Sequence, residues 1–86
     1  MAQISLPTSA SLLEAVVKAV KDSGGKATNV EIHDRVVKDL GLTKEQVDAT
    51  HSGNRTELEY RLAWARTNAK KKGLLVAAGS KMWALP

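Results

Sequence analysis

The sequence predicts a mainly α-helical fold that ends in a small β-hairpin, which places it in the α+β class. Apolar residues recur at helical spacing in three segments, and glycines or other turn-forming residues separate these segments. Two short apolar runs around a glycine then close the chain. A chain of 86 residues buries only about 60–65% of its unfolded surface, so we expect one domain, residues 1–86, with one modest core. Residues 1–7 are expected to be flexible.

The first helix is expected at about residues 9–23. Ser11 and Glu14 have the spacing of a capping box, in which two side chains satisfy the orphan amide groups at a helix start. Thr8 or Ser9 could instead cap the helix one turn earlier. The apolar residues that follow form one stripe, which predicts a helix with one buried face.

Two further helices are expected at about residues 29–40 and 43–48. A short extended link at Lys26-Ala27 comes before the first of them. Each helix opens with a capping box, Thr28 with Glu31 and Thr43 with Gln46. Gly41 ends the first of the two helices, since glycine readily takes the left-handed conformation that closes a helix.

The longest helix is expected at about residues 55–72, after a run of turn residues at 51–54. Asn54 and Glu57 form its predicted capping box, and Gly73 ends it. Its predicted inward stripe is Leu58, Leu62, Ala65 and Ala69. Because two of these four are alanines, we expect the helix to lie close against its neighbours.

The last two strands are expected at about residues 74–77 and 82–85, around turn residues 78–80. The predicted order is therefore helix, short strand, helix, short turn, long helix and hairpin. That is the order of a winged helix-turn-helix. Helices 29–40 and 55–72 form the helix-turn-helix, and the hairpin is the wing.

Positive charge gathers in the second part of the chain. Residues 1–50 hold six Lys or Arg and seven Asp or Glu, a net −1, whereas residues 51–86 hold seven and two, a net +5. This polarity suits a polyanion on one side of the molecule, although a solvated surface also explains it. The absence of cysteine excludes a disulfide framework and a thiolate metal site. With no apolar run near the roughly 20 residues of a membrane span, we expect a cytoplasmic protein.

Four sequence elements resemble a known family. They are Ser52-Gly53, Arg61-Leu62-Ala63-Trp64-Ala65, Lys72-Gly73-Leu74, and Gly79 four residues before Trp83. At these distances the chain resembles the amino-terminal domain of Mrr-type, modification-dependent restriction endonucleases. The resemblance implies a winged-helix DNA-binding domain that delivers a separate nuclease domain to DNA, often modified DNA. The Asp…Glu-x-Lys metal-binding core of that nuclease class does not follow Trp83, so we expect no enzyme activity in this chain and any nuclease in a separate domain or subunit.

The candidate DNA contacts lie at the start of the long helix, near its end, and in the wing. In a winged helix the leading part of the outer helix face enters the major groove, and the wing lies near the backbone. Arg can pair with guanine and Asn with adenine, while backbone amides before the helix favour a phosphate. The predicted DNA-binding residues are Ser52, Gly53, Asn54, Arg55, Thr56, Glu59, Tyr60, Lys70, Ser80 and Lys81. We expect double-stranded DNA as the partner, no cofactor or metal, and a monomer.

Several side chains also have a purely structural interpretation. The lysines at 70–72 could serve only to offset the helix dipole. Trp64 and Trp83 could stack on bases, but because the chain has no Phe we expect both rings in the core. Arg61 could pair with Glu57, with an acid on another helix, or with DNA.

His33 and His51 have no partners at metal-ligand spacing, so the sequence predicts no catalytic or metal site. The main alternative function is a protein-interaction or dimerisation module without direct DNA contact, and RNA binding is a third. An interaction module should present a contiguous apolar patch on the outer face of the long helix. The sequence places mostly Thr, Tyr, Glu and Lys on that face.

Overall fold

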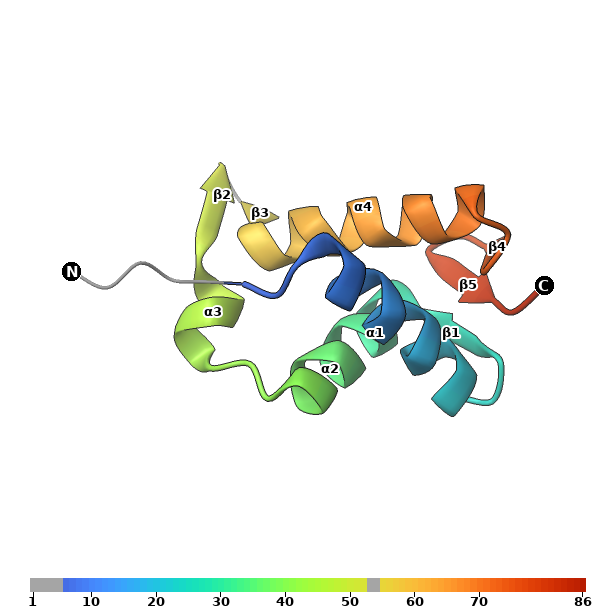
Figure 1. The fold of residues 1–86 in the computed structure, drawn as a ribbon, viewed down its shortest axis with the longest axis horizontal. Helices are drawn as coiled ribbons and strands as arrows, with labels where there is room; N and C mark the ends of the chain where they lie inside the picture. The colour runs from blue at the N-terminus through green and yellow to red at the C-terminus, as the bar shows by residue number, and fades with distance from the viewer. Residues whose placement is uncertain (1–5, 53–54) are drawn as a thin grey trace.

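The computed structural model describes residues 6–52 and 55–86, with only the backbone at 50–52 and 55. The expected flexible start therefore lies mostly outside the described residues. Figure 1 shows the elements, which are α1 (Ser9–Asp22), β1 (Lys26–Thr28), α2 (Asn29–Leu40), α3 (Lys44–Asp48), β2 (Thr50–Ser52), β3 (Arg55–Thr56), α4 (Glu57–Lys71), β4 (Val76–Gly79) and β5 (Met82–Ala84). This arrangement confirms the predicted mainly helical α+β fold of the winged-helix type. None of the described helices is long and apolar enough to cross a membrane.

The core forms where α1 packs against both α2 and α4. The buried residues described in this core are all aliphatic. They are Leu12, Ala15, Val16, Ala19, Val20, Ala27, Ile32, Val36, Leu58, Leu62, Ala65, Ala69 and Leu75. The predicted inward stripe of the long helix supplies four of these residues, and that prediction is confirmed. Since α1 and α4 both contribute alanines, their backbones can approach closely.

Helix starts follow the capping predictions in two of four cases. Thr28 with Glu31 opens α2, and Thr43 with Gln46 opens α3, both as complete capping boxes. At α1 the box expected from Ser11 is wrong, and the earlier alternative holds. There the side chain of Thr8 accepts a hydrogen bond from the Ser11 amide at 3.2 Å.

The start of α4 corrects a second expectation. Its cap is Thr56, whose side chain accepts from the Glu59 amide, and not Asn54. The helix therefore spans Glu57–Lys71, two residues shorter at its start and one at its end than the expected 55–72. The reason lies in the segment before it, where β2 and β3 pair as a small antiparallel hairpin that the sequence analysis missed. Because Arg55 pairs in this hairpin, its backbone is extended and cannot begin the helix.

The wing belongs to a three-stranded antiparallel sheet in the order β1-β5-β4. Its strands differ from the expected 74–77 and 82–85, because the turn lies at Ser80 and Lys81 and not at residues 78–80. Leu75 precedes β4 and is fully buried in the core. Trp83, at the centre of β5, faces Ala27 on one side and Ala77 on the other.

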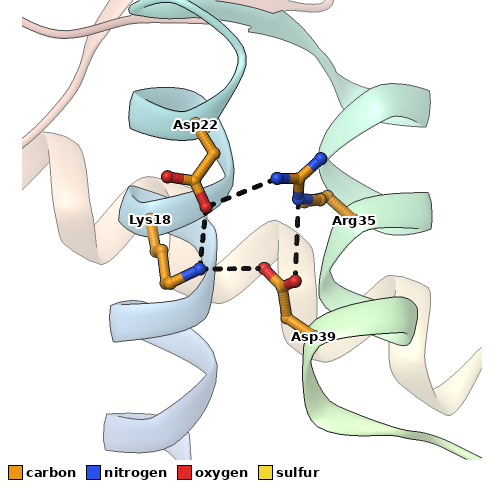
Figure 2. Close-up of polar contacts among 4 residues, drawn as sticks. All are labelled: Lys18, Asp22, Arg35 and Asp39. Carbon is orange, nitrogen blue, oxygen red and sulfur yellow. Dashed lines mark hydrogen bonds and ion pairs between the residues drawn. The ribbon is translucent and has the colours of Figure 1, made fainter.

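Four charged side chains join α1 to α2 (Figure 2). Lys18 Nζ lies 2.7 Å from Asp22 Oδ2 on its own helix and 3.6 Å from Asp39 Oδ2 on α2. Arg35 Nη2 lies 3.6 Å from Asp22 Oδ2, and Arg35 Nε lies 3.6 Å from Asp39 Oδ1. Cations and anions thus alternate around the cluster, which favours one register of α1 against α2.

This cluster gives the fold a pH dependence. The hydrogen bond from Lys18 lowers the pKa of Asp22 below its ordinary value of 3.8, and the same bond raises the pKa of Lys18 above 10.5. The Asp22 contribution is present above pH 3.8 and is lost as the pH falls through its lowered folded pKa. The Lys18 contribution is present below pH 10.5 and is lost as the pH rises through its raised folded pKa.

Replacing Asp22 with Asn is expected to lower the thermal unfolding midpoint slightly between about pH 5 and pH 9 and to flatten its fall in acid. The effect should be small because Lys18 is 61% exposed and solvent screens the pair. Melting curves followed by circular dichroism at about a dozen pH values between about 2 and 9 measure the unfolding midpoint as a function of pH. Asp34→Asn is the control, since the Asp34 side chain is 76% exposed, and it should keep the acid fall unchanged. If the two variants show the same acid profile, the cluster does not couple folding to pH.

Candidate nucleic-acid interface

The outer face of α4 is the candidate nucleic-acid interface. Figure 1 shows α4 running between the β2–β3 hairpin at one end and the β4–β5 wing at the other. Its fifteen residues span about 22 Å at 1.5 Å per residue. Among the predicted DNA-binding residues, Lys70 therefore lies in the last turn of α4, far from those at the helix start, and Ser80 and Lys81 lie in the separate turn of the wing. The structure does not bring them together in one cluster.

At the start of α4, two predicted site residues, Thr56 and Glu59, cap the helix. The Thr56 hydroxyl donates to Glu59 Oε1 at 3.0 Å, and the Thr56 amide donates to the same oxygen at 3.1 Å. These two side chains hold the helix start, which is a structural role. Ser52 and Arg55 lie opposite each other in β2 and β3, where only their backbone is described. The predicted sites at 53–54 lie outside the described residues.

The wing turn is hydrogen-bonded to the start of α2. The carbonyl oxygen of Lys81 accepts a hydrogen bond from the Asn29 amide at 2.9 Å. Two residues further on, Trp83 Nε1 donates to Asn29 Oδ1 at 2.8 Å. Lys81 has a φ of 54°, a left-handed conformation that lysine rarely adopts. The turn that presents Ser80 and Lys81 is therefore fixed at its base by Asn29.

The Trp83 bond is expected to stabilise the fold measurably. Trp83→Phe keeps a ring against the core but leaves Asn29 Oδ1 without its donor, so we expect a loss of about 1–2 kcal/mol in the free energy of unfolding. Urea denaturation followed by circular dichroism measures it. Trp64→Phe is the matched control, because that ring is 51% exposed and the change should stay within about 0.5 kcal/mol. Equal losses in the two variants would contradict this role of Trp83.

The two tryptophans have different environments, which corrects half of the prediction. Trp83 is half-buried and packs against the core, as expected. Trp64 is 51% exposed, so the expectation that it belongs to the core is wrong. It precedes the buried Ala65 by one residue, which turns it about 100° away from the inward stripe. Together with Tyr60, Ala63 and Thr67 it lines a hollow of about 370 Å³, and we call these four residues the aromatic patch.

The basic residues of α4 and the wing divide into paired and unpaired groups. Arg61 Nε donates to Glu57 Oε1 at 3.0 Å, which answers the question the sequence left open about its partner. The lysines at 70–72 and Lys81 are all exposed, and no ion pair among the described residues includes them. From residue 57 to residue 86 six Lys or Arg stand against two Glu, a net +4. The carboxyl end of α4 and the wing turn therefore carry uncompensated positive charge.

A second hollow, of about 420 Å³, lies where α2, α3 and α4 meet. Its lining mixes apolar and charged side chains, including His33, Asp48 and Arg66. His33 Nδ1 lies 3.6 Å from Asp34 Oδ1, too long for a hydrogen bond. Across residues 6–52 and 55–86, no group of three His, Cys, Asp or Glu side chains is placed to hold a metal ion.

Comparison with protein families identifies the domain. The family model of the Mrr N-terminal domain matches residues 10–86, which is nearly the whole chain. The chain belongs to this family. Neither the curated proteins nor the solved structures gave a match. The resemblance seen in the sequence is therefore confirmed, and the Mrr N-terminal domain is a domain of restriction systems that is amino-terminal and not catalytic.

Two features of this Mrr N-terminal domain were missed by sequence reasoning. One is the β2–β3 hairpin, which lies where only a run of turn residues was expected. The other is the exposed aromatic patch on α4. Helical spacing alone could have indicated the patch, since Ala63, Trp64 and Thr67 lie three, four and seven residues after Tyr60.

Proposed function

We propose that this Mrr N-terminal domain binds double-stranded DNA, with the outer face of α4 in the major groove and the wing near the phosphate backbone. One observation carries the proposal: the lysines at 70–72 and Lys81 are exposed, and no ion pair among the described residues engages them. In the first part of the chain, Lys18 and Arg35 are paired with acids, and the exposed lysines there belong to a segment whose seven acids bring its net charge to −1. Charge that is not neutralised within the molecule is available to neutralise phosphates.

The contacts fall into two classes. Lys70, Ser80 and Lys81 approach the phosphates, which position the domain without reading sequence. Tyr60 faces the groove from the outward side of α4, and the backbone of the β2–β3 segment with Arg55 lies at the leading end of the helix. Thr56 and Glu59 act indirectly, because their mutual hydrogen bonds fix the helix start.

Fluorescence anisotropy of a labelled duplex at several salt concentrations tests the proposal. With about three to five phosphate contacts, the logarithm of the binding constant should fall against the logarithm of salt with a slope near −3 to −4. An absence of binding even at low salt would overturn it. We also propose that the domain acts as a monomer in the cytoplasm and delivers a nuclease domain or subunit to DNA, the chain itself having no enzyme activity. Incubation of the chain with plasmid DNA and Mg²⁺ should leave the DNA uncut.

The aromatic patch favours a second candidate function, a protein-interaction or dimerisation module. An exposed tryptophan on an otherwise solvated helix is typical of protein interfaces. Sedimentation velocity distinguishes the two candidates: a concentration-dependent dimer that Trp64→Ala dissociates would support the second. A monomer that binds duplex DNA would support the first.

A further inference from the structure

The aromatic patch has a composition unlike the surface around it. Its members Tyr60, Ala63, Trp64 and Thr67 are all uncharged and line one hollow on the outward side of α4. Trp64, the largest of them, is 51% exposed. The next turn of the helix is basic, with Lys70 and Lys71. On its other side the patch borders the acidic first turn, with Glu57 and Glu59. A ligand that contacts both the apolar hollow and the basic turn would combine apolar and anionic groups.

Duplex DNA offers one such combination in its major groove. The base edges there present hydrogen-bond donors and acceptors, and the only apolar group among the four bases is the C5-methyl of thymine. The phosphates along the same groove supply the anionic groups for the lysines. Building on the proposed DNA binding, we infer that the aromatic patch reads thymine in the major groove by contact of Trp64 and Tyr60 with its C5-methyl group.

A second copy of the chain fits the patch less well. A symmetric contact would bring the two basic turns together if the two α4 helices ran parallel, and would set each basic turn beside the acidic first turn, with Glu57 and Glu59, if they ran antiparallel. The chain as a whole is also positively charged, at +4. A net charge of the same sign on both copies opposes their association, whereas it favours association with the polyanionic duplex.

The test removes the methyl group alone. Anisotropy competition compares a random-sequence duplex pool with the same pool in which deoxyuridine replaces thymidine, which keeps the base pairing and the charge. Loss of one buried methyl is worth about a fourfold change in affinity, so the deoxyuridine pool should compete at least about fourfold more weakly. Trp64→Ala should abolish this difference and keep the salt slope. Leu40→Ala is the control, because Leu40 is 37% exposed at the end of α2, and it should keep the difference.

The possible outcomes distinguish a failure of thymine reading from a failure of DNA binding. Salt-dependent binding that is equal for the two pools would overturn thymine reading and leave DNA binding intact. An absence of binding to either pool at low salt would overturn both. A dimer in sedimentation velocity that Trp64→Ala dissociates would also overturn thymine reading, because the patch would then be a protein interface.

Discussion

Replacing Ile32 with alanine is expected to remove about 2–5 kcal/mol from the free energy of unfolding. Ile32 is fully buried where α2 meets the core. Its truncation would leave a cavity, because the buried residues around it are leucines, valines and alanines that already fill their own positions. Small domains have only about 5–15 kcal/mol of total stability, so the variant would lose a large part of it. Urea denaturation followed by circular dichroism measures the loss.

The same helix offers a matched control. Val30 is also an aliphatic β-branched residue of α2, but it is 68% exposed. Val30→Ala should change the stability by no more than about 0.5 kcal/mol, and in the stabilising direction, because alanine is the better helix former. A similar loss in the two variants would mean that α2 does not bury the face that the structure assigns to it.

Reversing the charges of Lys70 and Lys81 together is expected to weaken DNA binding roughly sixtyfold at about 0.1 M salt. Each phosphate contact contributes about 0.9 to the slope of log binding constant against log salt, so the loss of two contacts removes about 1.8 from it. If the variant and the wild type bind equally at about 1 M salt, the variant's log binding constant is then about 1.8 lower at about 0.1 M. The slope itself should become shallower by about the same amount. Anisotropy titrations of Lys70→Glu/Lys81→Glu across several salt concentrations measure both quantities.

Lys21→Glu/Lys38→Glu is the control for net charge. Lys21 and Lys38 are exposed and lie in the last turns of α1 and α2, as Lys70 lies in the last turn of α4. This double variant therefore has the same total charge, but it leaves α4 and the wing unaltered. It should retain most of the affinity. If it loses as much as the first variant, binding depends on total charge and not on this surface.

Local patterns predicted α2 and α3 well because their signals are local. The capping boxes of both helices connect residues only three apart, and nothing distant competes with them. The start of α4 shows the limit of this reasoning. Asn54 with Glu57 and Thr56 with Glu59 have the same spacing, so the sequence permits two starts. The antiparallel pairing of β2 with β3 decides between them, and strand pairing is a property of two segments together.

The candidate site was predictable in its charge but not in its apolar part. Exposure of the lysines at 70–72 follows from their position on a helix with a known buried stripe. The buried environment predicted for Trp64 came from composition, since a chain without Phe needs other large side chains for its core. Composition does not indicate which of the two tryptophans is buried. The inner side of α4 is filled by leucines and alanines, and only Trp83 lies on a strand that faces the core.

The position of β5 within the sheet has a consequence for the order of folding. The strand comes last among the described elements, yet it lies at the centre of the sheet, pairing with β1 and β4 on its two sides. Residues 26–28 therefore find their partner 54 to 58 positions later, at residues 82–84. During synthesis the helices can pack on local contacts, but β1 cannot pair until residues 82–84 have been synthesised. The wing is thus the last part of the described fold to be synthesised, and a nascent chain can acquire it only after every helix has been synthesised.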